Sequence, residues 1–463
     1  MKLLQIILIL SFLNLTAFAQ DENSSKQLPY KNDPVVVSKL NALKGNESIK
    51  LSNPKVEGLS GGWKKSSRFS HGPFTRDYCT KMPYASDRQT AVYCGQGHND
   101  PHYNDAWEYH LGSNTWHCLT MPDGGSTAKY MRTMWVKVYG RNGKGKEKNE
   151  EKRLKMKKEI HDWVEKNIVI KNGYPQTSKN AGPVFQWHTW DGLTYDPLNG
   201  KMHWAVLGNQ ESNLKRYCTA LGKDFNEEKK KTKEALGLFS FDPIAKKWSI
   251  HFRKNPMPRM RGMGGSLTYI PDLQQIIWYV AASNVSPGDY AMWSWDLKKD
   301  TWSELKPNGG KSIRTLVEKE KVAPGEELQM AYSVKHKALV CAQGQFVFVY
   351  NFQKNEWKKV AENKDVHAYD SHTVFDYDSV NDVFILVQPK HSHATYNPVK
   401  YHKHKKGLFA FSLNTKKWEE LTPTGAGLFM KPKYSALKGY YDPQHNAFII
   451  SSKGVWVYRY KEK

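Results

Sequence analysis

The chain has 463 residues, which is enough for one large domain or two to three small ones. Hydrophobic residues make up 39% of the chain and exclude wholesale disorder, and 69 Lys and Arg residues against 45 Asp and Glu residues give a formal net charge of +24. The chain has 16 Trp, 25 Tyr and 18 Phe residues, and rings this abundant favour a sheet-rich fold.

Residues 1–19 have the features of a cleavable secretory signal. One Lys precedes an apolar run from Leu3 to Leu13, and the sequence Ala-Phe-Ala follows at positions 17–19. The run is shorter than the roughly 20 apolar residues that a membrane span needs. We therefore expect a secreted or periplasmic protein with no membrane association. Residues 20–56 are polar, with scattered Pro and Asn, and are expected to form a leader outside the folded domain.

An internal repeat fills the rest of the chain, residues 57–463. Each unit has a Tyr, a turn, an apolar run, an aromatic-x-aromatic pair and then a Trp seven residues after the pair. The complete units pair Trp107 and Tyr109 with Trp116, Phe239 and Phe241 with Trp248, Trp293 and Trp295 with Trp302, Phe348 and Tyr350 with Trp357, and Phe409 and Phe411 with Trp418. The Tyr residues that begin the units are Tyr84, Tyr195, Tyr269, Tyr332, Tyr377 and Tyr441. A sixth aromatic pair, Trp456 and Tyr458, is followed by no such Trp.

The spacing of these units predicts an all-β propeller. Alternate residues of a strand face the same side, so each aromatic-x-aromatic pair puts two rings on one face. Units of about 50 residues with four short strands are typical of propeller blades. We predict six four-stranded blades, with seven as the alternative, closed by an N-terminal strand. Trp63, in the sequence Gly-Gly-Trp-Lys-Lys, is the expected substitute for the Trp that the last unit lacks. A β-sandwich with coincidental aromatic spacing is the competing interpretation.

This arrangement resembles the kelch superfamily of propellers. The residues that carry the resemblance are the Tyr, turn, apolar and aromatic units, with Gly95-Gln-Gly97 and the pair of Trp107 and Trp116 closest to the family pattern. The resemblance implies the fold but not the activity, because such propellers include binding modules and several kinds of enzyme. A weaker similarity connects the chain to secreted propeller-fold polysaccharide lyases.

Nearly all the long connections between the predicted strands are expected to fall on one face of the propeller. They include an insertion at 122–183, within which residues 147–166 predict a helix, because Met156, Ile160, Trp163 and Val164 form one apolar stripe. We interpret this helix as a lid that packs its stripe on the propeller, with a partner-binding helix or a degenerate seventh blade as alternatives. Long loops on a rigid scaffold commonly carry function, so this face is the expected working face.

Positive charge is concentrated in the same connections. Lys229–Lys231 with Lys233 lie in one predicted loop and His402–Lys406 in another. Clustered cations attract polyanions, so the expected partner is an acidic polysaccharide with uronic or sulfated groups. No motif that reads DNA or RNA occurs, and we expect a monomer.

Candidate site residues lie where the inner strands would begin, at the mouth of the central channel. The predicted catalytic residues are His98, His188, His372, Arg261 and Tyr434. The predicted substrate-binding residues are Asn99, Trp187, Trp190, Arg76, Arg259, Lys431 and Lys433. Arg can neutralise a carboxylate bidentately, and His or Tyr can remove the neighbouring proton while another group protonates the leaving oxygen. The expected activity is therefore polysaccharide cleavage by β-elimination.

Other functions compete with this hypothesis. The main alternative is a non-catalytic propeller that binds a glycan or a protein. A copper radical oxidase of the galactose oxidase type is disfavoured because its Tyr-His pair, Tyr401 and His402, lies in a Lys-rich loop. Glycoside hydrolysis needs two opposed carboxylates, and only Asp77, Asp191 and Asp370 lie near the predicted mouth.

The sequence predicts no cofactor, although two H-x-H pairs leave a metal conceivable. These pairs are His391 with His393 and His402 with His404. Five cysteines leave at least one unpaired. Cys79, Cys94 and Cys118 either contribute one disulfide or are buried free thiols.

Overall fold

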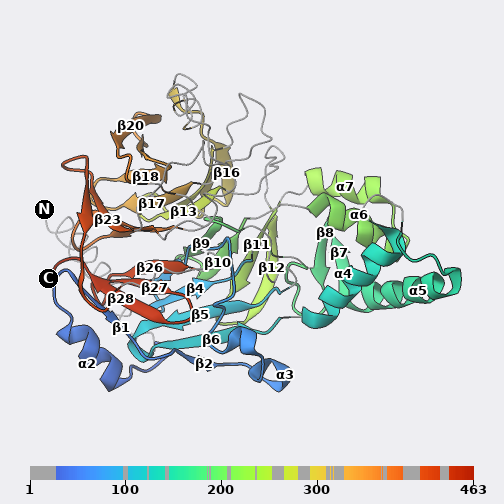
Figure 1. The fold of residues 1–463 in the computed structure, drawn as a ribbon. Coiled ribbons are helices and arrows are strands. Elements are labelled where there is room, and N and C mark those ends of the chain that lie inside the picture. The colour runs from blue at the N-terminus through green and yellow to red at the C-terminus, as the bar shows by residue number, and fades with distance from the viewer. Residues whose placement is uncertain are drawn as a thin grey trace, which may run out of the picture.

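Six antiparallel sheets form a closed six-bladed propeller in this computed structural model (Figure 1), as the sequence predicts. The structure describes residues 28–96, 103–122, 125–140, 145–184, 186, 189–205, 210–234, 237–252, 265–279, 292–308, 313, 316, 328–366, 368, 373–388, 407–427 and 437–462.

Each blade has four antiparallel strands, which follow chain order from the centre of the ring outwards except in blade 6, where the N-terminal β1 is the outer strand. Blade 1 contains β3 (Tyr84–Ala85), β4 (Thr90–Tyr93), β5 (Ala106–His110) and β6 (Thr115–Thr120), with β2 (Lys55–Glu57) added outside β6. Blade 2 contains β9 (Leu193–Asp196), β10 (Lys201–Trp204), β11 (Gly237–Asp242) and β12 (Lys247–Phe252). Blade 3 contains β13 (Ser266–Ile270), β14 (Gln275–Tyr279), β15 (Met292–Asp296) and β16 (Thr301–Glu304).

The second half of the ring follows the same order. Blade 4 contains β17 (Gln329–Ser333), β18 (Ala338–Gln343), β19 (Phe346–Asn351) and β20 (Glu356–Glu362). Blade 5 contains β21 (Val374–Asp378), β22 (Val383–Gln388), β23 (Gly407–Ser412) and β24 (Lys417–Leu421). Blade 6 contains β26 (Lys438–Asp442), β27 (Ala447–Ser451), β28 (Val455–Arg459) and β1 (Glu47–Lys50), with β25 (Thr424–Gly425) outside β1.

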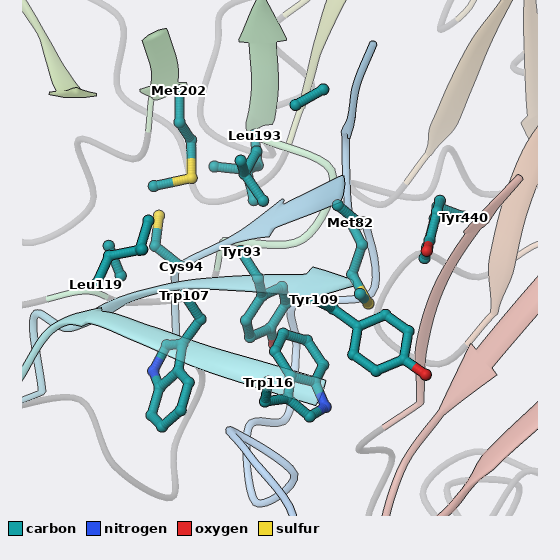
Figure 2. Close-up of a cluster of buried hydrophobic side chains, with 14 of the residues drawn as sticks. Met82, Tyr93, Cys94, Trp107, Tyr109, Trp116, Leu119, Leu193, Met202 and Tyr440 are labelled. Atoms are coloured by element: carbon teal, nitrogen blue, oxygen red, sulfur yellow. The ribbon is translucent and has the colours of Figure 1, made fainter. Parts of the chain in front are cut away.

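The repeated Trp packs against the aromatic pair of its own unit. In all five complete units the second aromatic residue of the pair is directly opposite the Trp on the neighbouring outer strand, as Tyr109 is opposite Trp116. The ring centroids of these five pairs lie 5.1–5.4 Å apart. Figure 2 shows Trp116 of blade 1 among the buried side chains of Tyr93, Trp107 and Tyr109. The spacing in the sequence is therefore a cross-strand contact, which stabilises each blade.

The prediction that Trp63 closes the ring is wrong. The outer strand of blade 6 is β1, which pairs with β28 in the register Ser48 opposite Tyr458. The Tyr458 hydroxyl donates to Asn46 Oδ1 at 3.0 Å, so it needs no Trp partner. Trp63 lies in the short helix α3 (Gly61–Lys64), where its ring packs 5.6 Å from Phe69. β1 lies within residues 20–56, the segment that the sequence analysis assigns to a leader outside the ring, and it is preceded by α2 (Pro34–Ala42).

Helices form a second, smaller unit beside blade 2 (Figure 1). We call this unit the helical module, and it consists of α4 (Gly125–Tyr139), α5 (Glu150–Asn167), the hairpin of β7 (Ile168–Lys171) and β8 (Tyr174–Thr177), α6 (Gln210–Leu221) and α7 (Phe225–Glu234). It has a hydrophobic cluster of its own, which includes Trp135, Ile160, Val164 and Tyr217. The module adjoins blade 2 through Tyr174, whose ring centroid lies 6.5 Å from that of Phe239 on β11.

The predicted helix at 147–166 corresponds to α5, but its apolar stripe has a different partner. Ile160 and Val164 are buried in the cluster of the module, together with residues of α4 and α6, rather than against a blade. α6 and α7 lie in a segment that was expected to be a loop. No helix in the described ranges combines the length and the hydrophobicity that crossing a bilayer requires. All five cysteines are free and buried.

Candidate functional site

The long connections of the chain join strand ends that lie on the same face of the propeller. In blade 2, the start of β9 pairs with the end of β10, and the start of β11 pairs with the end of β12. The same register holds in the other blades, so the inner strands all begin on one face, which we call the loop face. The opposite face, formed by the short turns within blades, is the turn face. The chain segments with the predicted site residues connect strand ends on the loop face.

The junction of blades 1 and 2 on the loop face joins two of these segments. The backbone N–H of Gln96 donates to Thr189 Oγ1 at 3.2 Å, and the N–H of Thr189 donates back to the Gln96 carbonyl at 3.2 Å. The N–H of Gly95 also donates to Gln186 Oε1 at 2.9 Å. These described residues flank His98 and His188 in the chain.

Arg76 contacts this junction through the carbonyl of Gly95 and is 1% exposed. Its Nη2 donates to both oxygens of Asp105, at 2.8 and 2.6 Å, and its Nη1 donates to the carbonyl of Gly95 at 3.4 Å. The guanidinium also lies 5.3 Å from the ring centroid of Tyr103. Arg76 is therefore neutralised by a buried carboxylate, and it supports the strand ends from which the two histidine segments leave.

Trp190 is also buried, with 3% of its surface exposed. Its backbone adopts a left-handed conformation with φ of 45°, and its N–H donates to the carbonyl of Tyr78 at 2.7 Å. Because its ring is enclosed by protein, Trp190 in this structure presents no stacking surface for a sugar.

The other predicted site residues lie outside the described residues, so their positions are not part of the structure presented here. They are His98, Asn99, Trp187, His188, Arg259, Arg261, His372, Lys431, Lys433 and Tyr434. The same holds for Asp370, Tyr401 and the two H-x-H pairs. Across the described ranges, no group of three or more His, Cys, Asp or Glu side chains is arranged to hold a metal ion.

The centre of the ring is crossed by a buried ion pair. Lys81, which precedes β3, donates from Nζ to Asp191 Oδ2 at 3.0 Å and to the carbonyl of Leu267 at 2.8 Å. Asp191 Oδ2 also accepts the N–H of Met330 at 3.2 Å. Burial raises the pKa of Asp191, while Lys81 acts to lower it. These contacts join blades 1, 2, 3 and 4 across the axis, so Asp191 serves to hold the ring together.

A second buried cation lies on the first residue of β26. Lys438 is fully buried, and its Nζ lies 5.3 Å from the ring centroid of Tyr93. Burial lowers the pKa of Lys438 to about 7, and the nearby Arg76 contributes in the same direction. Three cations thus lie near the starts of the inner strands. Arg76 and Lys81 each contact a carboxylate, and Lys438 contacts the ring of Tyr93.

Comparison with known proteins adds no relative: no protein-family model and no curated protein matches this chain.

Proposed function

We propose that this protein is a secreted or periplasmic, kelch-like propeller that binds an acidic polysaccharide on its loop face and cleaves it by β-elimination. The observation that carries the proposal is the pair of hydrogen bonds between Gln96 and Thr189. These bonds fix the backbone that adjoins His98 and His188 in the chain, and His is the side chain that most often acts as a general base or acid.

The proposed reaction needs three roles. Arg259 or Arg261 neutralises the carboxylate of a uronic acid residue, which acidifies the neighbouring C–H. A histidine or Tyr434 removes that proton, the electron pair forms a carbon–carbon double bond, and the glycosidic C–O bond breaks. A second histidine donates a proton to the leaving oxygen. The products are a new reducing end and an unsaturated non-reducing end, and no external oxidant or water is consumed.

The distribution of charge supports a polyanionic substrate. Residues 125–179 and 210–234, which span the helical module, contain 22 Lys and Arg residues and 11 Asp and Glu residues, a net charge of +11. Nearly half of the chain's excess positive charge therefore lies in segments attached to the loop face beside blades 1 and 2. A cationic surface of this kind raises the local concentration of a polyanion.

A second candidate is a propeller that binds the polysaccharide without cleaving it. The burial of Arg76 and Trp190 favours this candidate, because both were expected to contact substrate and both are enclosed by protein. The two candidates share the same ligand and the same face but differ in chemistry.

The proposal is tested by incubating the protein with a panel of uronic acid polysaccharides and following the ultraviolet absorbance of unsaturated ends. We expect activity on one member of the panel and a loss of about 100-fold or more in kcat/KM for His188→Ala. The control is His336→Ala, in the turn between β17 and β18 on the turn face, which should retain wild-type activity. Binding without absorbance change would favour the second candidate.

Binding to any panel member should also weaken steeply as salt is raised, because charges at a surface are screened. A folded protein that neither binds nor cleaves any panel member would overturn both candidates.

A further inference from the structure

One position in the propeller departs from the pattern of the other five blades. In every blade the repeated Tyr pairs with a residue of the second strand, and the next residue of that strand faces the following blade. In blade 2, Tyr195 pairs with Met202 and the next residue is His203. The corresponding residues in the other blades are Val92, Ile277, Val340, Ile385 and Ile449, all of them buried. Only blade 2 has a polar side chain here.

His203 is almost completely buried between blades 2 and 3, with 2% of its surface exposed. Its Nδ1 lies 2.8 Å from Ser240 Oγ on β11. Its Nε2 lies 3.6 Å from Asp196 Oδ2, which is longer than a hydrogen bond, and within the described residues this nitrogen has no hydrogen-bond partner. This buried ring nitrogen thus makes only a long contact, with the carboxylate of Asp196, at a position where the other blades have a methyl group.

Blade 3 provides the opposite wall. The ring of Trp295 lies 5.0 Å from that of His203 and 4.4 Å from that of His251, which extends from β12. His251 Nε2 lies 2.7 Å from Asp300 Oδ1, and the same oxygen accepts Trp295 Nε1 at 3.1 Å. One indole and two imidazoles therefore line a single space between the blades.

That space is a cleft of about 300 Å³. Its lining also includes Asn199, Lys201 and Ser249. Asn199 belongs to the turn that follows β9 and Asp300 to the turn that follows β15, so the cleft lies toward the turn face. Its volume matches the lower end of the range for small-molecule sites and can hold a single sugar residue.

The polar side chains of this cleft offer more donors than acceptors. Asp196 already accepts the backbone N–H groups of Leu198 and Asn199 and the side-chain amide of Asn199. Asp300 is engaged by His251 and Trp295. The groups left to donate to a ligand are the ammonium of Lys201 and the imidazole of His203. The hydroxyl of Ser249 donates to the carbonyl of Ser240 at 3.5 Å and can still accept a hydrogen bond.

The polar composition is costly for the fold. A buried polar group without a hydrogen bond lowers the stability of the fold by about 1–3 kcal/mol, which is the cost of removing it from water. An aliphatic side chain at the same position has no such desolvation penalty. Because five blades demonstrate that Val or Ile fits here, stability does not explain the histidine. A ligand that accepts a hydrogen bond from His203 does.

We infer that the cleft between blades 2 and 3 is a second binding site, on the turn face, for the acid group of a hexuronic acid residue. The carboxylate lies between Lys201 and His203, and the sugar hydroxyls meet Asn199 and Ser249. The inference of an anion site depends only on the residues of the cleft, whereas the choice of a sugar acid as its ligand depends on the proposed function. The site is distinct from the loop face and involves none of the residues proposed for catalysis.

The test is calorimetric titration of the full-length mature protein with galacturonate, with galactose as the uncharged match and sulfate as the bare anion. We expect galacturonate to bind, galactose to bind at least 10-fold more weakly, and Lys201→Gln to weaken galacturonate at least 10-fold. Gln occupies the position of Lys201 in blade 3, as Gln275, so this variant is compatible with the fold. His203→Ile gives a second, independent variant with the same expected loss.

Three results would overturn the inference. They are the absence of galacturonate binding, equal affinities for galactose and galacturonate, and unchanged affinity in both folded variants. Sulfate that binds as tightly as galacturonate would overturn the assignment to a sugar. The titration is independent of cleavage, so a failed lyase assay leaves this result unaffected, and a failed titration leaves the lyase assay unaffected.

Discussion

Polar side chains are buried in two regions of this propeller, around the inner strands and in the cleft between blades 2 and 3. Around the inner strands two buried carboxylates meet a cation: Asp105 binds Arg76 and Asp191 binds Lys81. In the cleft, His203 Nε2 has no hydrogen-bond partner among the described residues. In the first region the Lys81–Asp191 pair joins different blades and the Arg76–Asp105 pair joins segments of blade 1, whereas the second region leaves donor groups facing a space.

The difference shows what each region does for the molecule. A propeller blade contacts its neighbours mainly through apolar layers, which are not directional. Buried ion pairs near the strand starts add fixed distances, within blade 1 for Arg76 and Asp105 and between blades for Lys81 and Asp191. The cleft adds no such restraint. Removing a residue from the first region should therefore weaken the fold, while removing one from the second should not.

The largest effect is expected from Arg76→Met. This change leaves the carboxylate of Asp105 buried without its cation, so the free energy of unfolding should fall by about 3–5 kcal/mol. The measurement is chemical denaturation followed by tryptophan fluorescence. Lys55→Met is the matched control, because the ion pair of Lys55 with Asp33 is exposed and should contribute less than about 1 kcal/mol. A loss for Arg76→Met no larger than that of the control would remove the structural role assigned to this pair.

A smaller effect, with a defined pH dependence, is expected from Lys438→Met. The pKa of Lys438 is about 7 in the fold and about 10.4 in an unfolded chain, so between these values the unfolded chain binds more protons. The wild-type protein should then gain stability relative to Lys438→Met as the pH rises from 7 to 9.5, by on the order of 3 kcal/mol. Denaturation of both proteins across this range measures the difference. Parallel curves would show that Lys438 is not titrated by folding.

The fold was predictable from sequence where its contacts are local. The aromatic residue and the Trp seven positions later, such as Phe411 and Trp418, are opposite each other across one tight turn, so their spacing is fixed by the hairpin. The closing strand β1 is different, because its partner β28 is about 400 residues away and the residue opposite Tyr458 is Ser48 rather than a Trp. The aromatic pattern gives no sign of such a strand, so the sequence analysis assigned the closing strand to Trp63 instead.

Two other differences have visible signals in the sequence. α6 was assigned to a loop because it lies between the second and third predicted strands of its blade, although Leu214, Tyr217 and Cys218 have the spacing of a buried helix face. The cleft has no signal in the features that the repeats share, because it depends on a residue that differs between them. His203 stands where the other units have Val or Ile, and that comparison requires only the sequence.

The comparison between the two buried regions is tested most directly by the double variant His203→Ile with Ser240→Ala, which gives blade 2 the residues that blade 5 has at Ile385 and Ala410. Its free energy of unfolding, measured beside wild type, should rise by about 1 kcal/mol, because a buried imidazole and its hydrogen-bond partner Ser240 are replaced together by apolar groups. The reciprocal variant of blade 5, Ile385→His with Ala410→Ser, should lose stability. A double variant in blade 2 that is less stable than wild type by more than about 1 kcal/mol would show that His203 supports the fold, and would contradict the account of the cleft as a binding site.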